Sequence, residues 1–174
     1  DSAFSYSGQK CSACSRVIVL ESIHDTFVER LVEATRSLNV GPAADPATSV
    51  GPVIDATAQQ RIREFIETGK QEGKVAIALP PPDTGYFTGP TVFTDIARNA
   101  VIAQQEILGP VVAVIKADSF DSALEIANGT DYALTGGLYS RTPAHIDRAQ
   151  QVYEVGNLYI NRGITGAIVS RQPF

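Results

Sequence analysis

A cysteine in a position that favours reactivity lies near the start of the chain. Cys11 directly follows the glycine-containing sequence Gly8-Gln9-Lys10, and the residues after it are compatible with a helix. Backbone N–H groups and the positive end of a helix dipole at such a turn favour the thiolate, which is the nucleophilic form of cysteine. Lys10 adds positive charge beside it. The pattern predicts a nucleophile, while Cys11 taken alone would be interpreted as a small buried hydrophobic residue.

A second cysteine, Cys14, lies three residues after Cys11, which is the spacing of a redox disulfide or of half a zinc site. A zinc site of this kind needs a second pair of ligands. The chain has only these two cysteines, and its two histidines, His24 and His145, are far apart in sequence. We therefore interpret Cys14 as a packing residue, predict no metal site, and predict that Cys11 is the reactive thiol.

An acidic residue marks the second stretch that could do chemistry, at residues 105–112. Glu106 precedes the sequence Gly109-Pro110, and an apolar run typical of a strand begins at Val111. Ligands bind in loops at strand ends in open α/β sheets, so Glu106 is a candidate ligand-binding residue. A solvated charge at the end of a helix, the usual role of a glutamate, is the other interpretation.

The third stretch, residues 161–174, is rich in small residues. Small residues expose backbone N–H groups, so Gly166 and Ala167 can form a binding site for a carboxylate. A flexible loop would explain the glycines equally well. Phe174 taken alone is interpreted as a core residue.

Strand-like and helix-like segments alternate along the rest of the chain. The predicted strands cover residues 17–20, 75–79, 86–93, 111–115, 138–139 and 157–161. The predicted helices begin at Asp25, at Asp55, at Ser119 or Asp121, and at Pro143. The third strand is expected to be bent or at a sheet edge, because Gly89-Pro90 interrupts it. The alternation predicts an α/β domain with a mainly parallel sheet, helices on both faces, and Cys11 at the sheet edge leading into a helix.

Composition limits the classes of partner. The 174 residues are about one domain, and the net charge is −5 with 14 scattered Lys and Arg residues, which argues against a nucleic-acid partner. No apolar run approaches the ~20 residues that span a bilayer, so no membrane partner is expected. The cysteine usage suits a reducing compartment. The absence of methionine indicates that the chain begins within a longer protein.

Three motifs resemble those of the aldehyde dehydrogenase superfamily, in the same order. Gly8-Gln9-Lys10-Cys11, followed by Ser12-Ala13, resembles the nucleophile motif. Residues 106–110 resemble the Glu-Ile-Phe-Gly-Pro motif, with Leu108 in place of phenylalanine. Residues 161–174 are similar to the corresponding loop of the 1-pyrroline-5-carboxylate (glutamate-γ-semialdehyde) dehydrogenase family, with Ser170 where that family often has glycine.

The resemblance implies roles for particular residues. Cys11 would be the catalytic nucleophile. Glu106 would hold the ribose hydroxyls beside nicotinamide, a task that suits a carboxylate because it accepts two hydroxyl hydrogen bonds, and Leu108 would provide an apolar wall. The substrate-binding residues implied in this way are Ser12, Gly166, Ala167 and Phe174, of which the first three hold the α-carboxylate and the last lines the aldehyde pocket.

The resemblance also implies a reaction and a larger protein. Residues 1–174 would form the catalytic domain, and the Rossmann NAD-binding half, the general-base glutamate and the oligomerisation tail would lie outside the chain. The thiolate of Cys11 would attack L-glutamate γ-semialdehyde, hydride would pass to NAD or NADP, and the resulting thioester would be hydrolysed to L-glutamate in proline catabolism. A homo-oligomer in the cytoplasm, or in the mitochondrial matrix of a eukaryote, is expected.

Two alternatives to this function stay open. The chain could belong to an aldehyde dehydrogenase for another small polar aldehyde, or it could be a folding or assembly domain without catalysis. The chain by itself is expected to be inactive and to bind NAD weakly, because the missing half would supply the general base and the remaining cofactor contacts.

Overall fold

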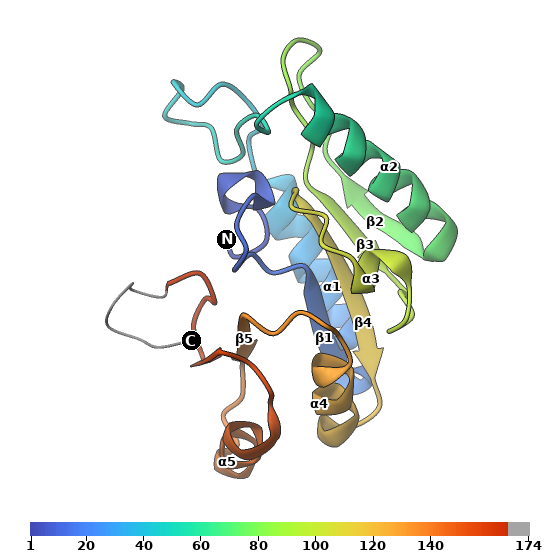
Figure 1. Cartoon of the computed structure of the whole chain (residues 1–174), viewed down its shortest axis with the longest axis vertical. Coiled ribbons are helices and arrows are strands. Elements are labelled where there is room, and N and C mark those ends of the chain that lie inside the picture. Colours follow the sequence, from blue (N-terminus) through green and yellow to red (C-terminus); the bar gives the residue numbers. More distant parts are fainter. Residues whose placement is uncertain (167–174) are drawn as a thin grey trace.

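The computed structural model of the chain describes residues 1–166 (Figure 1). The elements in chain order are the 3-10 helix η1 (Ser5–Gly8), β1 (Arg16–Leu20), α1 (Glu21–Arg36), α2 (Ala56–Glu72), β2 (Lys74–Ala78), β3 (Thr91–Thr94), α3 (Val101–Gln104), β4 (Val111–Ala117), α4 (Phe120–Asn128), β5 (Thr135–Leu138), α5 (Pro143–Val152) and β6 (Asn157–Ile160).

Four of the strands form a central sheet in the order β1-β4-β3-β2. β1 and β3 both run parallel to β4, while β2 runs antiparallel to β3. β5 and β6 form a separate parallel pair. The predicted α/β fold with a mainly parallel sheet is therefore confirmed.

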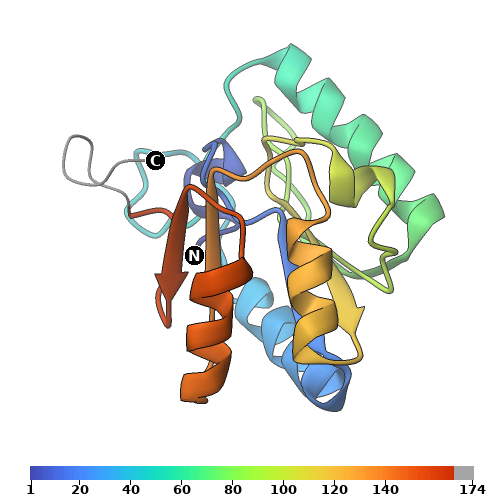
Figure 2. The ribbon, with the colours of Figure 1, turned by 60° about the horizontal axis from the view of Figure 1, so that its bottom comes forward.

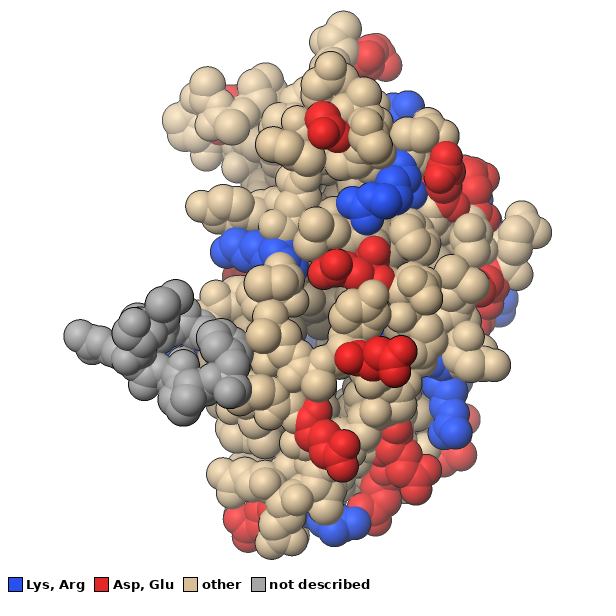
Figure 3. Space-filling view, in the orientation of Figure 1, with Lys and Arg blue, Asp and Glu red and all other residues tan. Residues whose placement is uncertain are grey.

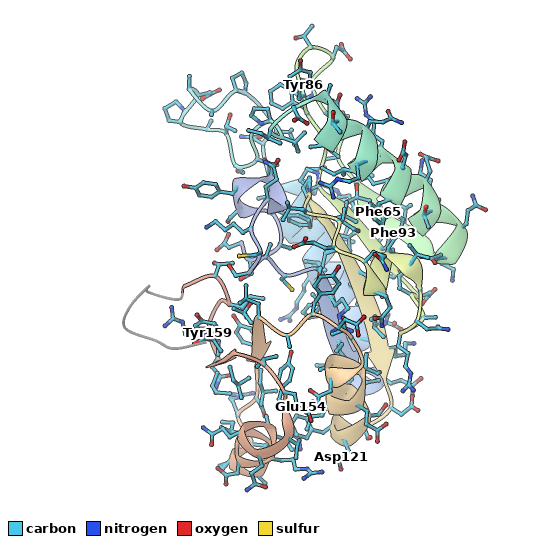
Figure 4. The ribbon with its side chains drawn as sticks, viewed as in Figure 1. Phe65, Tyr86, Phe93, Asp121, Glu154 and Tyr159 are labelled. Carbon is cyan, nitrogen blue, oxygen red and sulfur yellow. The ribbon has the colours of Figure 1, made fainter. Side chains whose placement is uncertain are left out.

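Helices cover both faces of the central sheet (Figure 2). Val112 and Val114 of β4 belong to a buried cluster that packs against α1, while Ala113 and Ile115 belong to the cluster under α2, α3 and α4. Figure 4 marks two aromatic members of the second cluster, Phe65 of α2 and Phe93 of β3. Because β4 is buried on both faces, its sequence is an almost continuous apolar run.

Local capping signals placed two of the helices correctly. Asp55 caps α2 by accepting a hydrogen bond from the backbone N–H of Ala58 at 2.7 Å. Ser119, rather than Asp121, caps α4 by accepting from the N–H of Ser122 at 3.1 Å. Side-chain caps of this kind satisfy N–H groups that the first helical turn leaves free.

Two expectations about the elements were wrong. β3 is not at an edge: it lies between β2 and β4, and all four of its residues are buried. The Gly89-Pro90 break comes just before its first residue, Thr91. Pro90 still takes part in the sheet as an acceptor, from the N–H of Leu79 at 3.0 Å. α1 begins at Glu21, directly after β1, so Asp25 lies inside the helix and does not cap it.

The small parallel pair is held to the main body through α4. Asn128 at the end of α4 donates to the carbonyl of Val152 at 2.7 Å and accepts from the N–H of Glu154 at 3.0 Å. α5 begins at Pro143, as predicted, since proline fits the first turn of a helix. Among the helices of residues 1–166, none is both long enough and apolar enough to cross a membrane.

Candidate active site

The two turns that carry Cys11 and Glu106 meet at one edge of the central sheet. The cysteine turn (residues 4–14) leads into β1, and the acidic turn (residues 105–110) leads into β4. β1 and β4 are parallel neighbours, so both turns lie at the amino edge of the sheet. Open α/β sheets usually bind ligands at the opposite, carboxyl edge.

The backbone around Cys11 is a tight turn and does not begin a helix. The N–H of Ala13 donates to the carbonyl of Lys10 at 3.0 Å, and the chain then enters β1. The prediction that Cys11 leads into a helix is wrong, because residues 10–13 form a single turn and the N–H of Cys14 donates to the carbonyl of Ser2 instead of continuing a helix. No helix dipole is therefore available from that side to stabilise a thiolate.

Unusual backbone angles shape the start of the cysteine turn. Tyr6, Ser7 and Gly8 have φ of 56°, 56° and 69°, a left-handed region that non-glycine residues seldom occupy. The hydroxyl of Ser7 donates to the carbonyl of Gly51 at 2.8 Å, and the side chain of Gln9 accepts from the N–H of Ile54 at 2.9 Å. These bonds anchor the turn on the loop before α2.

The two thiols differ in exposure and in acidity. Cys11 is exposed, whereas Cys14 is half-buried and its thiol donates to the carbonyl of Arg16 at 3.3 Å. Burial raises the pKa of Cys14 from its ordinary value of 9.0 to about 11. Cys14 is therefore a protonated, unreactive thiol near neutral pH, which supports its interpretation as a packing residue. Within residues 1–166 no three His, Cys, Asp or Glu side chains form a group that could hold a metal ion.

Lys10, beside Cys11 in sequence, has a defined position. Its ammonium nitrogen lies 4.3 Å from the centre of the Tyr6 ring, within range of a cation–π interaction. The Tyr6 ring is 76% exposed. The left-handed backbone at Tyr6 thus presents an aromatic ring that keeps a positive charge on the cysteine turn.

Gly8 brings the cysteine turn into direct backbone contact with the acidic turn. A Cβ atom on Gly8 would lie 2.0 Å from the carbonyl oxygen of Gly109 and 2.9 Å from the nitrogen of Pro110. Only glycine allows this approach, and its φ of +69° favours glycine for a second reason. The turn of Cys11 and the turn of Glu106, far apart in sequence, are therefore in direct contact.

The acidic turn presents two different surfaces. Glu106 is exposed, and Leu108 is half-buried with φ of 50°. Between them Ile107 is buried, and its carbonyl accepts a hydrogen bond of 2.6 Å from the guanidinium of Arg61 in α2. An exposed carboxylate next to an apolar side chain suits a pair of sugar hydroxyls beside an apolar ring, so these residues fit the ribose and nicotinamide end of NAD.

Of the third stretch the structure describes residues 161–166, and Gly163 in this part lies close to Ser2. A Cβ atom on Gly163 would lie 3.1 Å from the side-chain hydroxyl of Ser2. The backbone carbonyl of Ser2 accepts a hydrogen bond from the N–H of Cys14 at 3.0 Å, which links this contact to the cysteine turn. Ser12 is half-buried and Gly166 is exposed. Within residues 1–166 the atoms nearest to a Cβ on Gly166 belong to Arg162, so no described contact joins Gly166 to Ser12. The predicted site residues Ala167 and Phe174 lie outside the described residues.

Arg61 and Gln9 are contacts of the site that sequence reasoning missed. Gln9 is part of the motif around Cys11, yet its tie to Ile54 depends on a loop distant in sequence. Arg61 directly precedes Ile62, which is on the inner face of α2. A basic residue next to a core residue was the one feature of the sequence that could have indicated the bond from Arg61 to Ile107.

Comparison with known proteins identifies the class. The profile of the aldehyde dehydrogenase family matches residues 1–174, and the chain belongs to this family. Among curated relatives, the 1-pyrroline-5-carboxylate dehydrogenase of Geobacillus kaustophilus (strain HTA426) is 55% identical over 174 residues, which are 99% of this chain and 34% of the relative. The chain thus spans about a third of the length of the curated relatives that it matches.

Solved structures with the same fold include members of this group. A 1-pyrroline-5-carboxylate dehydrogenase from Thermus with bound NAD has a TM-score of 0.95 and 45% identity, over 99% of this chain and 34% of that one. Proline utilization A from Bdellovibrio bacteriovorus has a TM-score of 0.97 and 53% identity, over 99% of this chain and 18% of that one. These matches confirm the family resemblance of the sequence.

Proposed function

We propose that residues 1–174 form the thiol-bearing catalytic domain of a 1-pyrroline-5-carboxylate dehydrogenase, which oxidises L-glutamate γ-semialdehyde to L-glutamate in proline catabolism. The observation that carries this proposal is the backbone contact between Gly8 and Gly109, which joins the turn of the exposed Cys11 to the turn of Glu106. The 55% identity to a relative of that name supports the choice of substrate.

Cys11 is the nucleophile in this proposal. Its thiolate attacks the aldehyde carbon, a C–S bond forms, and the carbonyl oxygen becomes an oxyanion that the backbone N–H of Cys11 helps to hold. The ammonium group of Lys10 lies over the Tyr6 ring, on the same turn as Cys11. NAD, when bound, would accept the hydride that leaves the aldehyde carbon, and Cys11 would then hold the carbon as a thioester. The general base for hydrolysis belongs to the part of the relatives' length that this chain does not span.

Glu106 and Leu108 are the proposed cofactor contacts. The carboxylate of Glu106 accepts hydrogen bonds from two ribose hydroxyls, and Leu108 provides the apolar surface beside the nicotinamide ring. NADP is the alternative cofactor, and the part of the protein that would read the adenosine end decides between them. Leu108 lacks the aromatic face that the family motif usually offers, so its contact is apolar packing alone.

The substrate's α-carboxylate is assigned to the hydroxyl of Ser12 and the backbone amides of Gly166 and Ala167, and Phe174 is assigned to the wall of the aldehyde pocket. The approach of Gly163 to Ser2, whose backbone carbonyl accepts a hydrogen bond from Cys14, supports this assignment for the described residues 161–166. The full-length protein is proposed to be a homo-oligomer. Its need for a free thiol at Cys11 favours a reducing compartment, the cytoplasm or the mitochondrial matrix.

A substrate panel tests the proposed function on the full-length protein. We expect kcat/KM for glutamate γ-semialdehyde to exceed that for propionaldehyde by about 100-fold, because only the former offers a carboxylate to Ser12. Ser12→Ala should raise KM for the semialdehyde and leave KM for propionaldehyde unchanged. A preference for an amine-bearing aldehyde would replace the proposal with the alternative of another polar substrate.

The isolated chain separates catalysis from a mere assembly role. Two hydrogen bonds to Glu106 contribute about 1.5–3 kcal/mol each at best. A millimolar Kd needs about 4 kcal/mol of binding free energy to remain after the entropic cost of ordering NAD has been subtracted. Calorimetry of the isolated chain should therefore give a Kd for NAD of about 1 mM or weaker. A micromolar Kd would contradict the proposal that most of the NAD contacts lie outside residues 1–174. Mass spectrometric trapping of an acyl group on Cys11 of the full-length protein would exclude a purely structural domain.

A further inference from the structure

The acidic turn holds a backbone conformation that it would not adopt without support. Leu108 has φ of 50°, in a region that branched, bulky side chains seldom occupy. Such residues persist where the surrounding contacts over-determine them. The peptide between Ile107 and Leu108 sets the directions of Glu106 on one side and Leu108 on the other, so whatever fixes this peptide also fixes the two proposed cofactor contacts.

Arg61 is the side chain that contacts this peptide. Its guanidinium donates to the carbonyl of Ile107 at 2.6 Å, and Ile107 itself is only 3% exposed. A hydrogen bond from a charged donor to a carbonyl on a buried residue is stronger than a neutral one, and its loss leaves that carbonyl unsatisfied. The peptide could recover a partner by rotating, and rotation would move Leu108 toward a more populated region of φ.

Ile62, the residue next to Arg61, also contacts the acidic turn. A Cβ atom on Gly109 would lie 2.6 Å from side-chain atoms of Ile62, so Ile62 packs directly under Gly109. Gly109 in turn touches Gly8 of the cysteine turn. Consecutive residues of α2 therefore hold consecutive parts of the acidic turn, Arg61 by a hydrogen bond and Ile62 by packing.

We infer that Arg61 is a positioning residue for the cofactor: it locks the left-handed conformation of the acidic turn and so presents Glu106 and Leu108 in the orientation that NAD requires. This inference rests on the proposed function for the identity of the cofactor. Arg61 acts through the backbone of Ile107, so its removal affects NAD binding more than the reactivity of Cys11 or the binding of the aldehyde.

Calorimetry of NAD binding to the full-length protein tests the inference. Arg61→Met keeps most of the length of the side chain and removes its donors. We expect the Kd for NAD to rise about tenfold, the equivalent of ~1.4 kcal/mol. The KM for the aldehyde and the rate of iodoacetamide labelling of Cys11 should stay within about twofold of the wild-type values. Arg61→Lys, which restores a charged donor, should recover most of the affinity.

Two further variants separate positioning from other roles. Arg63→Met, at an exposed position of the same helix, is the matched control and should leave the Kd unchanged. In a Leu108→Gly background the left-handed conformation has no steric penalty, so Arg61→Met should raise the Kd by less than in the Leu108 protein. An undiminished tenfold loss in that background would mean that Arg61 contacts NAD directly, and would overturn the inference.

The remaining outcomes are equally decisive. A Kd for NAD unchanged by Arg61→Met, or an equal loss of NAD affinity, aldehyde KM and thermal stability, would overturn the positioning role. If Arg61→Met does not fold, Arg61→Leu, which also lacks a donor, takes the same tests with the same expected direction. A wild-type protein that binds NAD but does not oxidise the semialdehyde would overturn only the proposed substrate, since the inference is measured by binding.

Discussion

The amino and carboxyl edges of the central sheet differ in backbone conformation and in charged contacts. At the amino edge, Tyr6, Gly8 and Leu108 hold left-handed backbone conformations, and the exposed Cys11 stands on turns that touch through backbone atoms. At the carboxyl edge, the turn after β3 carries Asp95, which pairs with Lys74 of β2 at 2.8 Å.

The carboxyl edge carries charged side chains as well as a close backbone contact, since a Cβ atom on Gly73 would lie 2.6 Å from the carbonyl oxygen of Thr94. His24 is buried in the second turn of α1, and its Nδ1 lies 2.8 Å from the carboxylate of Asp25. The bond from Lys74 holds the pKa of Asp95 below its ordinary value of 3.8, with smaller effects from His24 and Lys116. Asp95 also has a positive φ, which aspartate tolerates better than leucine does. On the face viewed in Figure 3, acidic and basic side chains are interspersed.

The difference between the two edges concerns where strained backbone conformations occur. Non-glycine residues in sparsely populated conformations tend to gather at functional sites, and three of the five with positive φ in residues 1–166, Tyr6, Ser7 and Leu108, lie around the proposed nucleophile and cofactor contact. At the carboxyl edge the Lys74–Asp95 pair is exposed, and exposed ion pairs usually add little stability. Substitutions at the two edges should therefore differ both in size and in kind.

The largest effect is expected at Cys11. In the full-length protein, Cys11→Ala should lower kcat by about 10⁴-fold or more, because it removes the nucleophile. NAD affinity and Tm should change little, since the side chain is exposed. Steady-state kinetics and calorimetry check this, with Cys14→Ala as the control that keeps turnover. Near-normal turnover in Cys11→Ala would refute the assignment of the nucleophile.

Gly8→Ala tests the contact between the two turns. The new methyl group would meet the carbonyl of Gly109 at 2.0 Å and would occupy a φ of +69°. We expect a loss of about 2–4 kcal/mol in the free energy of unfolding, because both backbones must move. Gly51→Ala is the matched control, since a Cβ there meets no atom within 4 Å. Equal unfolding midpoints of the two variants in denaturant would show that the turns are not tightly apposed.

The free energy of unfolding should depend on pH through Cys14, with an effect smaller than that of Gly8→Ala. Its pKa is raised from 9.0 to about 11 by burial, so the folded state holds the proton more tightly than the unfolded state does. The stabilisation is fully present below about pH 9 and is lost as the pH rises toward 11, by about 2 kcal/mol.

The difference in unfolding free energy between wild type and Cys14→Ala should accordingly shrink over this range, as chemical denaturation at several pH values can measure. A constant difference would contradict the burial of the thiol. Limiting iodoacetamide at pH 8 should label Cys11 first, because the raised pKa of Cys14 leaves about one thousandth of it as thiolate.

The smallest effect is expected for the ion pair at the carboxyl edge. Asp95→Asn should lower Tm by about 2 °C or less at neutral pH, because the Lys74–Asp95 pair is exposed. The pKa of Asp95 is lowered in the folded state, so its contribution exists above the ordinary value of 3.8 and disappears as the pH falls below it. Calorimetric scans at pH 7 and near pH 2 should show the difference and then its loss. A larger loss than that of Gly8→Ala would reverse the comparison of the two edges.

Much of this protein was determined by the sequence itself, wherever the signal was local. Asp55 and Ser119 cap their helices through bonds to residues three positions away, and Pro143 starts α5 for an equally local reason. The apolar run of β4 was recognisable because burial on both faces leaves no polar alternation. That of β1 is apolar because its side chains contribute to both buried clusters, although four of its five residues are only half-buried. The motifs around Cys11 and Glu106 pointed to the family that the comparisons then confirmed.

Only the tertiary structure decided which of these segments meet. The position of β3 inside the sheet, the turn at Cys11 in place of a helix, and the bond from Arg61 to Ile107 all depend on partners distant in sequence. The left-handed residues of the two turns have the same origin, because the close approach of Gly8 to Gly109 and the packing of Ile62 hold them there. Local patterns report hydrogen bonds within a few residues, whereas contacts between turns are set by how strands pair and helices pack.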